Sequence, residues 1–212
     1  MAYKNIDSII INTSCNLFIE KGYNNVSVNE ICSACSITKP TLYYHFKSKE
    51  DILYEYFHLL IINSVNTICE LKNQNIPVNL SEVNSADTNK DNSNEQEAPS
   101  LGCNGKALVL EAFNILFSVL TSKGYDMTQA FVSACVCDIS KAVYFPDSIS
   151  DSITDYIIMG QRDGSIINPS NSSELYFSLC HTFIGYLVYW CQSNGHTDES
   201  NTINRALLPL FY

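Results

Sequence analysis

Two helix starts that lie close together in the sequence constrain the fold more than any other feature of this chain. Ser27 followed three residues later by Glu30 is the pattern of a capping box, which predicts a helix beginning at about Val28. Thr38 and Pro40 predict a second start, because Thr accepts a hydrogen bond from the first helical turn and Pro has no N–H to lose there. Two short helices in this succession are typical of a helix-turn-helix.

The second of these helices would be the recognition helix of a DNA-binding protein. It is expected to end near Phe46, and residues 33–37 join it to the first helix. In this motif the N-terminal side chains of the second helix meet base edges in the major groove. Lys donates to guanine, and the Thr methyl and Pro ring can contact thymine. Four residues are therefore predicted to read bases: Lys39, Pro40, Thr41 and Tyr43. Three residues that follow are predicted to bind phosphate: Tyr44, His45 and Lys49.

The charge of the chain is distributed unevenly, and its N-terminal part is the least acidic. The formal net charge is -10, and residues 1–50 contain five lysines against four acidic residues, a net of +1. The chain has 12 basic and 22 acidic residues in total, which leaves 7 and 18 for the remainder, a net of -11. The N-terminal part is therefore the one that would not strongly repel an anionic polymer such as DNA.

Apolar residues recur at helical spacing along most of the rest of the chain, without a convincing strand pattern. Ser48 with Asp51 caps a long helix that reaches about Cys69. The other predicted helices cover residues 3–21, 107–120, 127–141, 149–162, 172–193 and 201–211. Residues 73–105 are rich in Asn, Ser, Asp and Glu. They cannot bury enough apolar surface to offset their ordering entropy, which predicts a disordered or mobile loop.

We therefore predict an all-α protein of about nine helices. Residues 1–47 are expected to form a helix-turn-helix domain, and residues 48–212 a larger helical domain. No apolar run approaches the ~20 residues of a membrane span, and the N-terminus lacks the layout of a signal peptide, so a cytoplasmic protein is expected. Paired carboxylates, a Gly-rich phosphate loop and a Ser/His/Asp order with distinctive spacing are absent from the sequence, so we expect neither an enzyme nor a bound cofactor.

Residues 17–53, LFIEKGYNNVSVNEICSACSITKPTLYYHFKSKEDIL, resemble the N-terminal domain of the TetR family of bacterial transcriptional repressors. The resemblance lies in the Leu-Phe and Gly-Tyr of the first helix, the polar cap before the second, and the Thr-Leu-Tyr-x-His-Phe recognition helix with a Lys after it. It implies an all-α homodimer that binds DNA and has a ligand cavity in its larger domain. It also implies that Ser27 binds phosphate, that Asn29 binds a base or phosphate, and that Thr38 belongs to the same surface. Where the family commonly has Gly, this chain has Ser36, which predicts a strained turn because Ser adopts positive φ only at a cost.

The larger domain supplies candidates for a dimer interface and for an effector site. The helices at 172–193 and 201–211 are expected to form a C2 interface, because the first carries more apolar surface than its own chain can readily cover. The predicted interface residues are Leu175, Leu179, Phe183, Leu187 and Trp190. The predicted effector pocket is lined by Phe113, Phe117, Phe131, Tyr156, Tyr176, Phe177 and His181. Such rings near Glu111 and Asp138 favour an aromatic or cationic small molecule, although most buried aromatic side chains are plain core.

The leading hypothesis is a ligand-responsive transcriptional regulator, most simply a repressor. It would bind a palindromic DNA operator as a homodimer and be released by a small-molecule effector. One alternative is a DNA-binding protein without such an effector, either architectural or regulated by a partner. Another is a thiol redox or metal sensor built on Cys32 and Cys35 or on Cys135 and Cys137. The nine scattered cysteines are more typical of reduced core residues.

Overall fold

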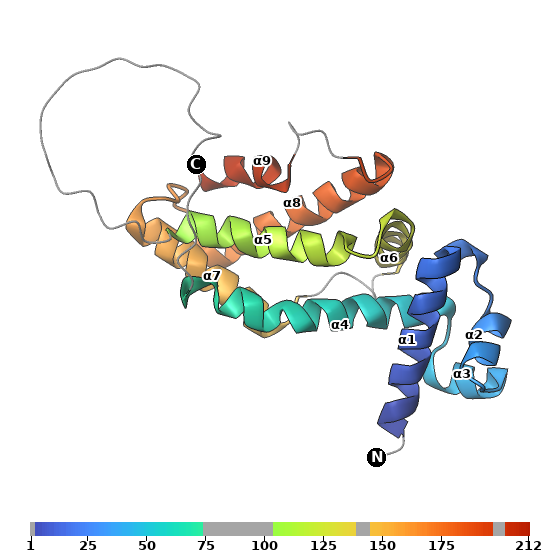
Figure 1. Cartoon of the computed structure of the whole chain (residues 1–212). Helices are drawn as coiled ribbons and strands as arrows, with labels where there is room; N and C mark the ends of the chain where they lie inside the picture. The colour runs from blue at the N-terminus through green and yellow to red at the C-terminus, as the bar shows by residue number, and fades with distance from the viewer. Residues whose placement is uncertain (1–2, 74–103, 139–144, 197–201) are drawn as a thin grey trace, which may run out of the picture.

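The computed structural model describes residues 3–73, 104–138, 145–196 and 202–212. Within these ranges the chain forms nine α-helices and no strand, which confirms the predicted all-α class (Figure 1). The helices are α1 (Tyr3–Lys21), α2 (Val28–Ala34), α3 (Lys39–His45), α4 (Lys49–Cys69), α5 (Gly105–Thr121), α6 (Tyr125–Cys137), α7 (Asp147–Asp163), α8 (Ser172–Gln192) and α9 (Ile203–Leu207). Short 3₁₀ turns are η1 (Tyr23–Asn25), η2 (Leu71–Asn73) and η5 (Leu208–Phe211).

Most of the predicted helix boundaries agree with the structure to within two residues. The helix predicted at 127–141 is α6, which begins at Tyr125 and ends at Cys137, and residues 139–144 are outside the described part. The predicted loop at 73–105 lies, except at its two ends, outside the described residues as well.

Helices α1, α2 and α3 enclose a small apolar core at one end of the molecule, which we call the head (Figure 1). Ile10, Phe18, Ile31 and Leu42 supply this core, and each is at most 1% exposed. These residues come from all three helices, so the head is held together by burial of one apolar face of each helix. The head therefore places α3 rigidly beside α1 and α2.

Helix α4 joins the head to the other helices, which we call the body. It starts where the Ser48 side chain accepts a hydrogen bond from the backbone of Asp51 (3.1 Å). Near the head α4 packs on α1, and farther along it packs on α5, α6 and α7 (Figure 1). At its far end the Tyr156 hydroxyl of α7 donates to the Ile68 carbonyl (2.6 Å). Because α4 contacts both parts, movement within the body can reach the head through it.

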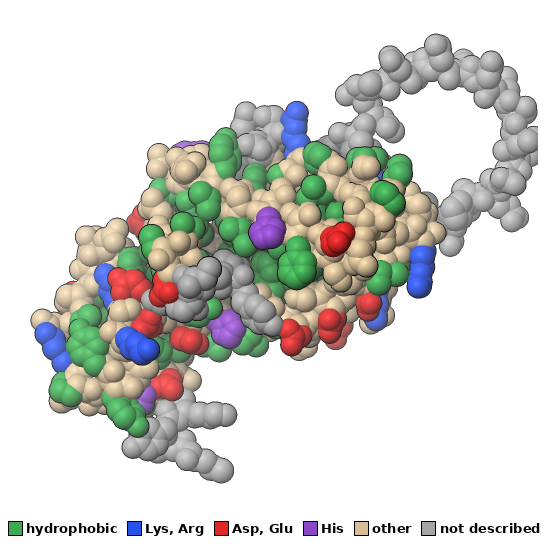
Figure 2. All heavy atoms as spheres, turned by 180° about the vertical axis from the view of Figure 1, so that it is seen from behind, with side chains coloured by type: hydrophobic (Ala, Val, Ile, Leu, Met, Phe, Trp, Pro, Cys, Tyr) green, Lys and Arg blue, Asp and Glu red, His purple; other side chains and the backbone are tan. Residues whose placement is uncertain are grey.

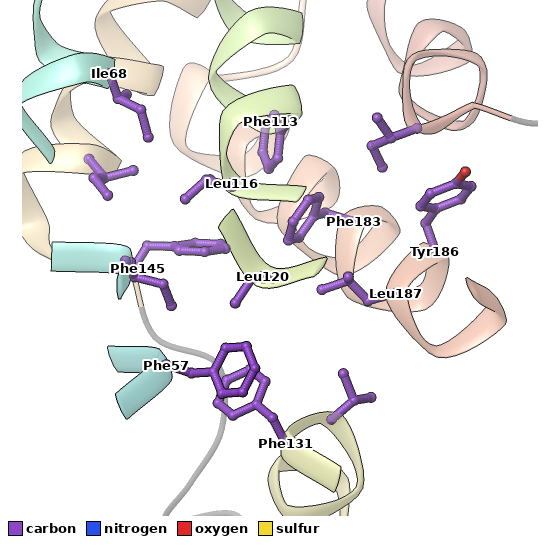
Figure 3. Packing of buried hydrophobic residues seen from close by; sticks show 14 of the residues in the cluster. Phe57, Ile68, Phe113, Leu116, Leu120, Phe131, Phe145, Phe183, Tyr186 and Leu187 are labelled. Atoms are coloured by element: carbon purple, nitrogen blue, oxygen red, sulfur yellow. The ribbon is translucent and has the colours of Figure 1, made fainter. Parts of the chain in front are cut away.

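The body has α5 near its centre, consistent with the apolar character of that helix on nearly all sides. Its Phe113 and Leu116 are completely buried, and the ring of Phe113 lies 5.3 Å from that of Phe183 in α8. Phe57 of α4 stacks on Phe131 of α6 at 4.4 Å (Figure 3). The first pair joins α5 to α8 and the second joins α4 to α6, and all four rings belong to one buried apolar cluster.

Helix length and apolar character together decide whether a segment can span a membrane. In the part of the chain that the structure describes, no single helix is both long and apolar enough to cross a bilayer. Helices α5 and α6 meet the criterion only as a pair, across a bend of 107°.

Candidate nucleic-acid interface

The start of α2 is held by the capping box that the sequence predicts. The backbone N–H of Glu30 donates to the Ser27 hydroxyl (3.3 Å), and the Ser27 N–H donates to the Glu30 carboxylate (2.9 Å). Lys21 adds an ion pair with Glu30 at 3.0 Å. The Ser27 N–H hydrogen bond, followed by the contact with Lys21, lowers the pKa of Glu30 to about 2. Ser27 and Asn29 are both exposed on this well-ordered first turn, where a phosphate could reach them.

The turn between α2 and α3 contains a residue in the left-handed region. Ser36 has φ 54, and the turn closes with a hydrogen bond from the Ile37 N–H to the Cys32 carbonyl (3.0 Å). The expected strain at Ser36 is therefore present, since a non-glycine residue in this region carries a steric cost of about 1 kcal/mol or more.

Helix α3 begins as predicted and turns its polar face outward. The Thr38 hydroxyl accepts from the Thr41 N–H (3.4 Å) and shares a hydrogen bond with the Thr41 hydroxyl (2.9 Å). Leu42 is completely buried against the head core. Four residues around it are exposed: Lys39, Pro40, Tyr43 and Tyr44, the two tyrosines by 50% and 76%. A helix-turn-helix protein that contacts bases in the major groove needs exposed side chains on the first turns of its recognition helix.

His45, predicted to bind phosphate, is placed differently by the structure. Its side chain is only 7% exposed, and its Nδ1 pairs with the carboxylate of Asp7 in α1. The pair is ionic when the imidazole is protonated. His45 therefore ties α3 to α1 inside the head, and its imidazole is not on the exposed face of α3. The sequence could not show this, because Asp7 is far from His45 along the chain.

Lys49 is also predicted to bind phosphate, but in the structure its ammonium group contacts other residues of its own chain. Its ammonium donates to the carbonyls of Tyr23 (2.8 Å) and Val26 (3.1 Å). It also lies 4.2 Å from the centre of the Tyr23 ring. Partial burial lowers the pKa of the Lys49 ammonium. The ammonium is thus occupied by the segment that joins α1 to α2.

A surface groove of about 350 Å³ lies between the start of α2 and the link from α3 to α4. It is lined by Val26, Ser27, Val28, Tyr43, Lys47, Ser48, Lys49 and Glu50. Lys47 is exposed here, and the prediction from sequence did not include it. Lys47 lies between the end of α3 and the Ser48 cap of α4. Because a short link between two helices runs along the surface, this position could have indicated from the sequence that Lys47 is exposed.

The predicted dimer-interface residues face the interior of their own subunit. Each of the five side chains is at most 8% exposed: Leu175, Leu179, Phe183, Leu187 and Trp190. They therefore cannot form a surface that meets a second subunit, and this part of the prediction is wrong. The exposed face of α8 carries Phe177, His181, Gly185 and Tyr189, spaced four residues apart on one side of the helix.

The predicted effector residues do not line one common site. Phe177 is 59% exposed and His181 is exposed as well, so both point out of the body. Phe117 packs on Tyr186 at 5.4 Å, and the Tyr176 hydroxyl hydrogen-bonds to Ser150 (2.7 Å). Phe113, Phe131 and Tyr156 are core residues in the contacts described above. A second surface groove, of about 480 Å³, lies on α7 and contains none of the seven predicted residues.

Several of the described cysteines are buried or partly buried thiols, whereas Cys137 is exposed. Burial raises the pKa of Cys15 to about 12 and that of Cys180 to about 11. Cys32 is buried, and burial also raises the pKa of its partly buried neighbour Cys35. Protonated thiols of this kind are poor nucleophiles and poor metal ligands. Across the described ranges, no group of three or more His, Cys, Asp or Glu side chains is placed to hold a metal ion.

The charges on the head are mixed in sign. Figure 2 shows Lys side chains next to Asp and Glu side chains at the head, in the lower left of the view. A field of this kind does not attract an anionic polymer strongly over long distances, so binding of DNA at the head would have to depend on short-range contacts.

Comparison with known proteins agrees with this geometry. Residues 10–56 match the model of the bacterial regulatory proteins of the tetR family. The uncharacterized regulator YuxN of Bacillus subtilis is 46% identical over 50 residues, which cover 24% of this chain and 17% of YuxN. The biofilm operon regulator IcaR of Staphylococcus aureus is 39% identical over 66 residues, 31% of this chain and 34% of IcaR. The chain thus matches no more than about a third of the length of these two curated relatives.

Solved structures extend the likeness in fold beyond the head. FadR of Thermus thermophilus, a TetR-family repressor crystallised with lauroyl-CoA, has a TM-score of 0.65 and 13% identity, over 96% of this chain and 90% of FadR. FadR of Bacillus subtilis, in complex with stearoyl-CoA, has a TM-score of 0.57 and 15% identity, over 96% of this chain and 97% of its own. The head thus matches the N-terminal part of tetR-family regulators in sequence, and the described fold is similar to that of solved TetR-family regulators.

Proposed function

We propose that this protein is a transcriptional regulator, most simply a repressor, that binds a palindromic operator in double-stranded DNA. The exposed first turns of α3 support this proposal most directly. Lys39, Pro40 and Tyr43 stand on a helix that is capped at Thr38 and anchored by the buried Leu42. Side chains presented on a rigid helix end can meet base edges without a large loss of entropy on binding.

The regulator acts as a C2 homodimer in this proposal, with the exposed face of α8 in the interface. Phe177 and Tyr189 expose 59% and 47% of their surfaces there, and an alanine-sized side chain at Gly185 would meet no atom within 4 Å. A glycine on such a face would allow a second helix to approach closely. Dimerisation also doubles the contacts of a weakly charged head and sets the heads about 34 to 36 Å apart, the spacing of successive major grooves.

Release from the operator requires an effector that binds two arrangements of the body unequally. We propose a lipophilic small molecule, aromatic or cationic, because the described body interior is rich in aromatic rings. The two FadR structures contain acyl-CoA ligands, so acyl-CoA is the other lipophilic class to include in a screen. Helix α4 would transmit the change, since α7 holds its far end through the hydrogen bond between Tyr156 and Ile68.

The tight ring packing in the body also favours a second candidate function, DNA binding without a small-molecule effector. In vitro binding of the full-length protein to fragmented genomic DNA, followed by sequencing, separates the two. One or a few discrete sites containing inverted repeats support an operator-specific regulator. Dispersed binding supports an architectural protein, and no enrichment at all would refute both. Screening planar aromatics, lipophilic cations and acyl-CoA for release from an enriched site then tests the effector.

A further inference from the structure

The ammonium group of Lys49 is surrounded by partners within its own chain. Tyr23 and Val26 offer their carbonyls at 2.8 and 3.1 Å, and these residues lie 26 and 23 positions away in the sequence. The ring of Tyr23 covers the ammonium at 4.2 Å, and the Phe18 ring lies at 6.0 Å. Charge-assisted hydrogen bonds and a cation–π contact together hold the group in one place.

Lys49 and its partners lie on two segments that are far apart in the sequence. Lys49 is the first residue of α4, whereas Tyr23 and Val26 bracket the η1 turn that leads from α1 into α2. A single ammonium therefore connects the start of α4 to the segment that positions α2. Buried contacts of Ile52 and Leu53 support the same junction through apolar packing, but the ammonium is its directional part.

Two of the three N–H bonds of this ammonium are engaged by carbonyls, and the Tyr23 ring lies against it, so at most one N–H is left for a phosphate oxygen. Any further contact with phosphate would cost a carbonyl its charge-assisted hydrogen bond in a partly buried place. Lys47, in contrast, is exposed and lines the same groove beside Ser27 and Tyr43. It has the position required of a phosphate ligand, at no cost to the packing of the head.

We infer that Lys49 is a positioning residue that fixes the head on α4, and that Lys47 makes the phosphate contact in this part of the surface. This assignment rests on the proposed DNA-binding function and changes the roles of two lysines within it. It also identifies a polar contact at each end of α4, the helix that joins the body to the head. Tyr156 holds the far end of α4, and Lys49 holds the near end.

Side-chain ammonium resonances in proton–nitrogen NMR test the assignment on the unmodified full-length protein. The probe is a mixed-sequence DNA duplex at low salt, because phosphate contacts do not depend on sequence. Lys47→Arg and Lys49→Arg assign the two resonances. The Lys49 signal is expected in the free protein, protected from exchange by its carbonyl partners, and unchanged by DNA. The Lys47 signal is expected to shift or appear only when DNA binds. A Lys49 signal that shifts on DNA binding, with Lys47 silent, overturns the assignment.

A salt series of DNA affinities gives an independent readout. Lys47→Gln should reduce the slope of log K against log salt by about 0.9 for each phosphate that it no longer neutralises, and so by about 2 in a dimer. Lys49→Gln should lower affinity at every salt concentration while leaving the slope unchanged. Lys72→Gln, at an exposed lysine remote from the head, is the control and should change neither quantity. A smaller slope in Lys49→Gln alone refutes the inference but keeps the proposed function. A parent protein without salt-dependent DNA binding refutes both.

Discussion

Replacing Gly105 with Ala tests the close crossing of α5 and α7. A Cβ at Gly105 would lie 2.0 Å from the backbone nitrogen of Gly160 and 2.4 Å from the carbonyl oxygen of Tyr156. Ordinary van der Waals contact begins at 3.4 Å, and the opposing atoms are backbone rather than flexible side-chain ends. The two helices would therefore have to separate by more than about 1 Å, which a close-packed core resists.

The separation would also pull on two hydrogen bonds that cap α5. The N–H of Gly105 donates to the Asp163 carboxylate (2.8 Å), and the N–H of Lys106 donates to the Ser165 hydroxyl (3.1 Å). Overpacking typically costs 1–3 kcal/mol, and weakening a charge-assisted hydrogen bond adds to this, so we expect a loss of about 3 kcal/mol or more. The gain in helix propensity from Gly to Ala is about 1 kcal/mol at most, and smaller at a helix end.

Urea unfolding followed by circular dichroism, at one fixed protein concentration, measures this loss as a shift in midpoint. Ser118→Ala, at an exposed position of the same helix, is the matched control and should change stability by no more than about 0.5 kcal/mol. If Gly105→Ala costs less than about 1 kcal/mol, the backbones of α5 and α7 are not as close as described, and the account of how α5 is anchored to α7 fails.

Four further predictions concern the head, the dimer and the thiols. Ser36→Gly should raise stability by about 0.5–1 kcal/mol in thermal or urea unfolding, because φ 54 costs glycine nothing. Lys39→Ala should reduce discrimination between operator and scrambled DNA by about 1–3 kcal/mol in fluorescence anisotropy, since it removes a base contact. Phe177→Asp should convert the proposed dimer to a monomer by light scattering, because a charge would be buried at the proposed interface. Burial raises the pKa of the Cys15 thiol from 9.0 to about 12, so its contribution to stability is complete below pH 9 and lost as pH rises towards 12.

Each of these predictions has a result that would count against it. A destabilised Ser36→Gly would show that the turn does not strain the parent protein. Full selectivity in Lys39→Ala would remove that residue from the groove, and a dimeric Phe177→Asp would place the interface on another face. Cys15→Ala should weaken the alkaline loss of stability, and an unchanged pH profile in this variant would mean that the thiol does not contribute to it.

The head could be predicted in detail because its signals are local. The Ser27 and Glu30 capping box, the Thr38 cap and the Ser48 cap each place a helix start through contacts three residues apart. The strained position at Ser36 was indicated instead by the family resemblance, because the family commonly has Gly at this position. Such contacts depend little on the rest of the fold.

The direction of side chains in the body could not be predicted in the same way. Helix α8 carries large apolar side chains on both its buried and its exposed face, for example Leu179 and Phe177, so helical spacing does not identify the inner side. The side-chain positions of His45 and Lys49 depend on contacts with Asp7 and with backbone carbonyls of the α1–α2 connection. Such contacts have no sequence signature. Tertiary contacts of this kind decide which polar groups remain available to DNA.

Selection of sequences from a random duplex library by the full-length protein tests the central claim most directly. A C2 dimer that inserts α3 into successive major grooves should enrich an inverted repeat with half-site centres about 10 base pairs, or 34 to 36 Å, apart or at a multiple of this. The enriched repeat should disappear or broaden with Lys39→Ala. Enrichment of no motif, or of a single half-site without a symmetric mate, would contradict the account of this protein as a dimeric, operator-specific regulator.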